Sequence, residues 1–168
     1  TVLMQTYWAF ERIGQQEVRV LAGGFQAWQA HGGDTTQRPA EYQPCRYEAR
    51  LRDCRANSAR LEDGEPRLVD ARGPQEWRAA HIAGATNCCW SDFTQRDEAN
   101  TLLPASDIHA LLAARHLSPE QETVTYCRTG ARSSFVYFVL RLMGWERLYN
   151  YDGSMTDWLL HQREVERG

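Results

Sequence analysis

Residues 122–132 read Glu-Thr-Val-Thr-Tyr-Cys-Arg-Thr-Gly-Ala-Arg, and a strongly apolar stretch over 133–143 follows them. The β-branched residues within 122–127 predict a strand, and the apolar composition of 133–143 predicts a buried helix. The loop from Cys127 to Arg132 therefore connects the carboxyl end of a strand to the start of a helix. Open α/β sheets place their ligand sites at such junctions.

The same alternation of strand and helix extends through the second half of the chain. The other expected elements are strands over 67–71, over 148–151 and directly after the turn at 81–85, and helices over 74–80, over 106–114 and around Trp158. Pro74 stands in the first turn of its helix, and Ser106 is expected to cap the next one. Alternating strands and helices predict an α/β fold with a parallel sheet covered on both faces.

Composition and charge exclude several classes of protein. The chain has 168 residues, 42% of them hydrophobic and 24% charged, as in an ordinary globular protein. The net charge of −3 argues against nucleic acid as a partner, and no apolar stretch approaches the ~20 residues that span a bilayer. All 19 cationic side chains are arginines, which excludes Schiff-base, pyridoxal-phosphate and Walker-type lysines. We expect no nucleic-acid partner, no membrane association and no cofactor.

The five cysteines do not describe a disulfide framework or a metal site, because their number is odd and no CxxC pair is present. This usage favours a reducing, cytoplasmic location. Cys88 and Cys89 are expected to be structural thiols. Cys45 is expected in a linker and Cys54 in a charged helix, where nothing around it indicates a role in catalysis.

An internal repeat with an offset of 130 residues determines the expected domain organisation. The identical pairs are Tyr7 and Tyr137, Gly14 and Gly144, Gly23 and Gly153, Trp28 and Trp158, and His31 and His161. Both copies are typical of a helix, a glycine, a short strand, a glycine turn and a helix with a tryptophan. We interpret residues 1–33 as the end of a first domain, 34–46 as a linker and 47–168 as a complete second domain. The chain is then expected to be a fragment of a tandem protein, and the remainder of the first domain is expected to pack on it.

Several effects favour a reactive thiolate at Cys127. Main-chain N–H groups at the start of a helix attract an anion, and Arg128 and Arg132 add two positive charges. Gly130 gives the loop the freedom to fold around the sulfur. Such surroundings lower a thiol pKa from ~8.5 to between ~3.5 and ~7.5, so that no dedicated base is needed. A lone cysteine at this position would more often be a buried structural thiol.

Four motifs in the same order resemble the rhodanese (thiosulfate sulfurtransferase) family. They are Leu-Val-Asp-Ala-Arg at 68–72, Glu76-Trp77 followed by His-Ile-Ala-Gly-Ala at 81–85, the Cys127 loop, and Tyr-Asp-Gly-Ser-Met-Thr-Asp-Trp at 151–158. The resemblance covers residues 45–168, and residues 1–33 resemble the end of a preceding rhodanese domain. It implies a five-stranded parallel sheet flanked by helices, preceded by a partial second copy.

The resemblance also implies a sulfurtransferase that acts through a Cys127 persulfide. The spacing C-x4-R, one residue shorter than the loop of related phosphatases, favours attack on sulfur over attack on phosphate. Arg128 favours thiosulfate as the donor, and a thiophilic acceptor such as cyanide or a thiol would take the sulfur. The alternatives are 3-mercaptopyruvate as the donor, a phosphatase or arsenate reductase, and a persulfide carrier that serves a protein partner.

The remaining candidate residues are assigned by their place in the motifs. The residues expected to contact the substrate are Arg128, Thr129, Gly130, Ala131, Arg132 and Arg72. Arg72 is expected either to contact the donor anion or to form an ion pair. The residues expected to support the site are Asp70, His81 and Asp152, of which Asp152 would close the sheet together with Ser154.

Overall fold

A parallel sheet forms the centre of the computed structural model, which describes residues 2–62, 66–95 and 101–168. Its strands are β1 (Arg67–Asp70), β2 (Thr86–Asn87), β3 (Thr123–Tyr126) and β4 (Leu148–Asn150), in the order β2-β1-β3-β4. Asp70 at the end of β1 pairs with Asn87 of β2 and with Tyr126 of β3. The carboxyl ends of these strands therefore meet at one edge of the sheet, and Cys127 follows β3 there.

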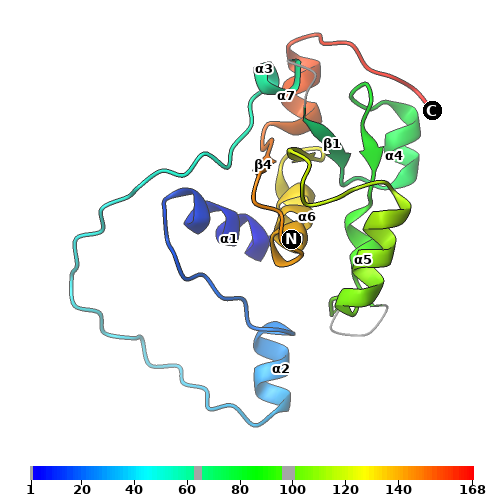
Figure 1. The fold of residues 1–168 in the computed structure, drawn as a ribbon. Coiled ribbons are helices and arrows are strands. Elements are labelled where there is room, and N and C mark those ends of the chain that lie inside the picture. The colour runs from blue at the N-terminus through cyan, green and yellow to red at the C-terminus, as the bar shows by residue number, and fades with distance from the viewer. Residues whose placement is uncertain (1, 63–65, 96–100) are drawn as a thin grey trace.

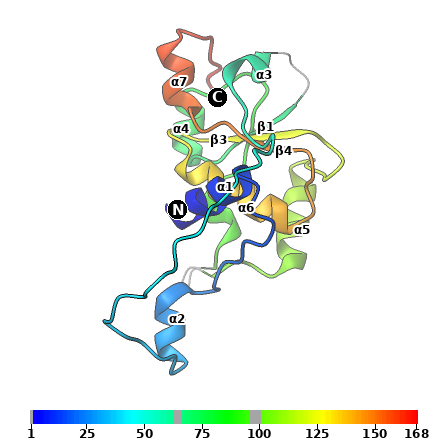
Figure 2. The same cartoon turned by 90° about the vertical axis from the view of Figure 1, so that its left-hand side faces the viewer.

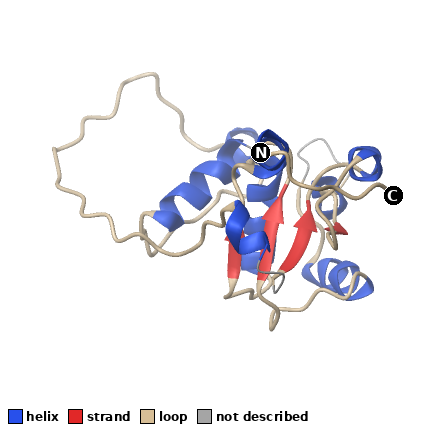
Figure 3. Cartoon of the chain, turned by 90° about the horizontal axis from the view of Figure 1, so that it is seen from above, coloured by secondary structure: helices blue, strands red, loops and turns tan. Residues whose placement is uncertain are grey.

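Helices lie on both faces of the sheet, as Figure 3 shows, so the predicted α/β fold is confirmed. They are α1 (Val2–Arg12), α2 (Gly24–Ala30), α3 (Ser58–Glu62), α4 (Pro74–Ala79), the 3-10 turn η1 (Trp90–Phe93), α5 (Ala105–Ala114), α6 (Ala131–Leu142) and α7 (Ser154–Leu160). The prediction that Ser106 caps α5 was wrong. This helix begins after Pro104, and the Ser106 hydroxyl donates to the Asp107 carboxylate instead.

Two clusters of buried side chains hold the two layers of helices on the sheet. Val69 of β1 packs with α5, α6 and η1, whereas its neighbour Leu68 packs with α3 and α7. Successive side chains of a strand point to opposite faces, so one short strand contributes to both clusters. Cys127 belongs to the cluster on the α6 side.

The described residues form four strands, where five were expected. Arg55 makes one isolated parallel bridge to Asn150 of β4. The Ala56 N–H donates to the Asn150 carbonyl, and the Asn150 N–H donates to the Cys54 carbonyl. The segment runs beside β4 as a fifth strand would, but only one residue of it is paired in strand geometry. The prediction of a helix at Cys54 was wrong, because this residue is buried beside β4 in an extended segment.

The N-terminal helix α1 packs along α6, as Figure 2 shows. The rings of Tyr7 and Phe138 meet edge to face with their centroids 4.8 Å apart. Glu11 is buried between the helices, where it accepts a hydrogen bond of 2.9 Å from the Tyr137 hydroxyl and pairs with Arg141 at 3.0 Å. Because α1 covers the outer side of α6, every residue from 133 to 140 of α6 is buried.

Residues 31–54 form neither a helix nor a strand and swing outward from α2 before returning to the sheet (Figure 1). The expected linker over 34–46 lies within this segment. The short strand expected between α1 and α2 does not form, because residues 15–22 have no neighbouring strand to pair with in the described part of the chain.

The two segments paired by the sequence repeat share several local features, although β4 of the later segment has no counterpart in the earlier one. α2 spans Gly24–Ala30, and α7 spans the positions 130 residues later. Gly14 and Gly144 both have positive φ, at 90° and 95°. The indole N–H groups of Trp28 and Trp158 each donate to the main-chain carbonyl six residues further on.

Candidate active site

Cys127 lies at the carboxyl edge of the sheet with its side chain 1% exposed. Burial acts to raise the pKa of its thiol, but hydrogen bonds from main-chain N–H groups and from the Ser133 hydroxyl outweigh it and lower the pKa. The main-chain donors belong to Ser133, Thr129 and Arg132. The first turn of α6 and the loop before it thus form a cradle that stabilises the thiolate.

Gly130 is the residue whose conformation makes this cradle possible. Its φ of +86° lies in the left-handed region that side chains rarely adopt. A Cβ at this position would lie 2.8 Å from the main-chain oxygen of Asp152. The loop can therefore pack against the segment before α7 only because residue 130 is a glycine.

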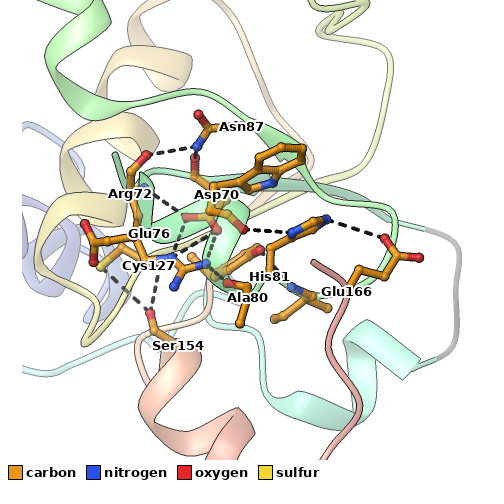
Figure 4. A network of polar contacts seen from close by, with 12 residues as sticks. Asp70, Arg72, Glu76, Ala80, His81, Asn87, Cys127, Ser154 and Glu166 are labelled. Carbon is orange, nitrogen blue, oxygen red and sulfur yellow. Dashed lines mark hydrogen bonds and ion pairs between the residues drawn. The ribbon is translucent and has the colours of Figure 1, made fainter. Parts of the chain in front are cut away.

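Ser154, the first residue of α7, fixes the loop from the other side. Its Oγ accepts hydrogen bonds from the N–H groups of Cys127 at 3.0 Å and Gly130 at 3.1 Å, and its own proton goes to the Tyr151 carbonyl at 2.8 Å. Figure 4 shows the hydroxyl beside the sulfur, at 4.0 Å. The motif at 151–158, interpreted from sequence as closing the sheet, also holds the cysteine loop.

The two loop arginines have different surroundings. Arg132 forms a bidentate pair with Glu76 of α4, with one N–O distance of 2.9 Å, and the hydrogen bond to Glu76 raises the pKa of its guanidinium. Arg128 is exposed, and its guanidinium forms no ion pair with any residue that the structure describes. Its main chain is held, because its carbonyl accepts from the N–H and hydroxyl of Thr156. Arg128 is therefore the loop cation that is free to meet an anion.

Thr129 and Ala131 enter the site through their main chain. Thr129 is exposed and supplies an N–H group to the sulfur, while Ala131 opens α6. Their side chains form none of the contacts that hold the sulfur in place.

Arg72 and Asp70 form a buried ion pair next to the cysteine loop (Figure 4). The Arg72 guanidinium donates to Oδ2 of Asp70 at 2.6 Å, to Oδ1 of Asp70 at 3.0 Å and to the Ala80 carbonyl. Of the two roles expected for Arg72, the geometry shows the ion pair. Asp70 also accepts from the Arg72 main-chain N–H, which fixes the turn after β1.

His81 and Asp152 make structural contacts around the site. The His81 ring stacks on Trp77, lies 2.9 Å from the Trp77 carbonyl through Nδ1, and faces Glu166 at 3.5 Å. Asp152 accepts a hydrogen bond of 2.7 Å from Arg55, next to the bridge of that residue to β4.

The structure also places near the cysteine loop four residues that the sequence did not assign to the site. They are Glu76, Ser133, Asn150 and, as a residue that holds the loop, Ser154. Of these residues, only Ser133 could have been assigned to the site from the sequence, because it directly follows the loop.

A cysteine whose thiol pKa is lowered by main-chain N–H groups at the edge of a parallel sheet defines a cysteine-centred α/β domain. The chain belongs to the rhodanese-like domain family, whose profile matches residues 55–161. The described residues hold no group of three or more His, Cys, Asp or Glu side chains suited to a metal ion. Among those residues, no helix is long and apolar enough to cross a membrane.

Curated relatives of the chain agree with this family. The chain is 33% identical to the sulfur carrier protein TtuD of Thermus thermophilus over 178 residues, which cover 90% of this chain and 62% of that protein. It is also 33% identical to a thiosulfate sulfurtransferase of Corynebacterium glutamicum, with 91% of this chain and 58% of that protein covered. The chain thus spans about 60% of the length of these relatives.

The fold is also similar to a solved structure of the anaerobic ergothioneine biosynthesis enzyme from Chlorobium limicola. The TM-score is 0.86 at 22% sequence identity, with 98% of this chain and 45% of that chain covered. At this identity the match shows a shared fold.

Proposed function

We propose that this chain transfers a sulfane sulfur from thiosulfate to a thiophilic acceptor through a persulfide on Cys127. The lowered pKa of Cys127 within the main-chain cradle carries the proposal, and the thiosulfate sulfurtransferase relatives support it. A thiolate at this position needs no neighbouring base to act as a nucleophile.

The reaction proceeds in two displacements. The Cys127 thiolate attacks the outer sulfur of thiosulfate, a new S–S bond forms, and sulfite leaves with the electron pair of the bond that breaks. The acceptor, cyanide or a thiolate, then attacks the terminal persulfide sulfur and releases Cys127 as a thiolate. The cradle N–H groups stabilise negative charge on sulfur before and after each step. Such covalent transfer predicts ping-pong kinetics.

Intact-protein mass spectrometry after treatment with thiosulfate tests this function directly. The protein is expected to gain the mass of one sulfur atom and to lose it again when cyanide is added. Cys127→Ser should abolish the gain, whereas the exposed Cys45→Ser control should leave it intact. A gain of sulfur that persists in Cys127→Ser would disprove the mechanism.

Arg128 is expected to determine the preference for thiosulfate, because its free guanidinium is the loop charge available to a dianion. Arg128→Gly should raise KM for thiosulfate roughly tenfold, the effect of losing one charge-assisted hydrogen bond. The same change should leave or improve activity with 3-mercaptopyruvate, which carries a single carboxylate. Steady-state kinetics with both donors measure the effect, and Arg38→Gly in the exposed segment before the sheet serves as the control. Equal losses on both donors would mean that Arg128 only shapes the loop.

A persulfide carrier is the second candidate function, because the relative TtuD is named a sulfur carrier protein. A carrier would form the same Cys127 persulfide but release sulfur only to a protein acceptor. Rapid loss of the persulfide to cyanide supports the enzyme, and retention in cyanide with loss to a partner protein supports the carrier. The five free cysteines fit the cytoplasmic location that we propose for either function.

We also propose that residues 1–33 belong to a first rhodanese-like domain, joined through 34–46 to the complete domain at 47–168. Phe25 and Trp28 of α2 are 63% and 44% exposed, whereas Met155 and Trp158 at the equivalent positions of α7 are 3% and 6% exposed. In the complete copy a sheet covers these side chains, so the sheet of a first copy is the partner that fits α2.

Hydrogen exchange tests this organisation. In the protein made from its complete gene, the main-chain amides of α2 should exchange as slowly as those of α7. In the present chain, α2 should exchange much faster than α7, because few buried contacts hold it. Fast exchange of α2 in both proteins would contradict a first copy.

A further inference from the structure

A buried polar cluster lies behind the cysteine loop, around Asn150 at the end of β4. Asn150 is 1% exposed. Its Oδ1 lies 2.7 Å from the Ser133 hydroxyl and 3.4 Å from the Thr125 hydroxyl, while its Nδ2 is buried without a hydrogen-bond partner. A buried N–H donor without a partner destabilises the fold, so its surroundings call for an explanation.

The hydroxyl protons of the cluster have other acceptors. Thr125 Oγ1 lies 3.2 Å from the Ser133 carbonyl, to which it donates. Ser133 Oγ lies 3.1 Å from the Gly130 carbonyl and also hydrogen-bonds to the Cys127 sulfur. Each hydroxyl has one proton and two lone pairs. Both oxygens can therefore accept a hydrogen bond from Asn150 while they donate elsewhere.

Flipping the side-chain amide of Asn150, so that Nδ2 and Oδ1 exchange positions, gives the unpaired donor hydrogen-bond partners. The two N–H bonds of Nδ2 then meet two hydroxyl oxygens, those of Ser133 and Thr125, in place of Oδ1. The oxygen moves to the position without a partner, where an acceptor is tolerated better than a donor. The Ser133 proton is no longer taken up by Asn150.

We propose that Asn150 is a positioning residue whose Nδ2 donates to Ser133 Oγ and thereby directs the Ser133 proton at the sulfur of Cys127. The inference rests on the proposed role of Cys127 as the nucleophile. Asn150 acts by donating a hydrogen bond to Ser133 Oγ, so that Ser133 does not donate its own proton to Asn150.

The pH dependence of Cys127 alkylation by iodoacetamide tests the proposal without relying on sulfur transfer. The reaction is followed on the peptide that contains Cys127, and its midpoint reports the thiol. Asn150→Leu is expected to raise the midpoint by about one pH unit, the effect of one weakened hydrogen bond to a thiolate. Ser133→Ala should raise it by a similar amount, and Ser133→Thr, which keeps the hydroxyl, should restore it. The charged groups facing the sulfur, Arg132 with its partner Glu76, are unchanged in all variants.

The opposite orientation of the Asn150 amide predicts a shift of the alkylation midpoint in the opposite direction. If Oδ1 takes the Ser133 proton, Asn150→Leu frees that proton for the sulfur, and the midpoint falls or stays constant. Either result overturns the proposal. The double variant Asn150→Leu with Ser133→Ala should shift no further than Ser133→Ala alone, whereas additive shifts would show that Asn150 does not act through Ser133.

A second variant covers the case in which Asn150→Leu does not fold. Asn150→Asp keeps the shape but offers only acceptors, so it should raise the midpoint, and Ser133→Ala should reduce that rise. A rise of the same size in both backgrounds reflects the added charge alone and contradicts the proposal. Thr123→Val, which removes another buried hydroxyl of β3 bonded to the Gln121 carbonyl, is the matched control and should leave the midpoint unchanged. If these shifts occur while no persulfide forms with thiosulfate, the proposed function fails and the role of Asn150 stands.

Discussion

Gly130→Ala is expected to reduce the rate of the proposed sulfur transfer at least about a hundredfold, the size of effect seen when one hydrogen-bond donor is lost from an oxyanion hole. The methyl group would lie 2.8 Å from the Asp152 oxygen and would stand on a backbone with φ of +86°. To relieve the clash, the loop must move away from α7, and this movement breaks the hydrogen bond from the Gly130 N–H to Ser154 Oγ. The N–H groups that hold the thiolate then lose their alignment, so the midpoint for Cys127 alkylation should rise with the loss of rate.

Gly144→Ala separates the local clash from general backbone strain. Gly144 also has a positive φ, of 95°, but a Cβ there meets nothing within 4 Å. This variant should lose about 1 kcal/mol of stability and keep full activity. The argument about the loop fails if Gly130→Ala retains both the rate and the alkylation midpoint of the wild type.

Glu11→Ala is expected to lower the free energy of unfolding by about 3 kcal/mol, because it leaves a buried guanidinium without its partner. The Glu11 carboxylate is 8% exposed and pairs with the Arg141 guanidinium, itself 13% exposed, and with the half-exposed Arg52. Burial raises the pKa of Tyr137, so this side chain keeps its proton and donates it to Glu11. Urea unfolding followed by circular dichroism measures the loss.

Glu17→Ala provides the matched control in the same N-terminal segment. Glu17 and Arg19 form an exposed pair at 3.6 Å, and such pairs contribute little to stability. No measurable change is expected. If Glu11→Ala is also as stable as the wild type, α1 is held on α6 by apolar contacts alone.

The sequence predicted the elements whose signals are local. The β-branched run before Cys127 and the apolar run after Arg132 are sufficient to place β3, α6 and the loop between them. A buried helix over 133–143 was expected from composition, and the structure places it at 131–142. The packing of α1 on α6 buries its outer side as well.

Sequence patterns did not predict the contacts between segments that lie far apart in the chain. The pairing of Arg132 with Glu76 joins residues 56 positions apart, and nothing in either motif indicates it. The hydroxyl of Ser154 was expected to support the sheet, and only the packing of α7 on the loop shows that it receives two loop N–H groups. The strand expected in residues 15–22 failed because a strand needs a neighbour, and sequence propensity does not supply one.

The sulfur of Cys127 receives three of its hydrogen bonds from the main chain, at Thr129, Arg132 and Ser133. Main-chain donors are present whatever the side chain is, provided that the backbone keeps its shape. Mutations that exchange the side chains of Thr129 or Ala131 can therefore accumulate without loss of the thiolate, whereas Gly130 cannot vary. Under the proposed function, substitutions at the residues around the cysteine, one at a time, can change the preferred sulfur donor, while the main-chain hydrogen bonds to the sulfur are kept.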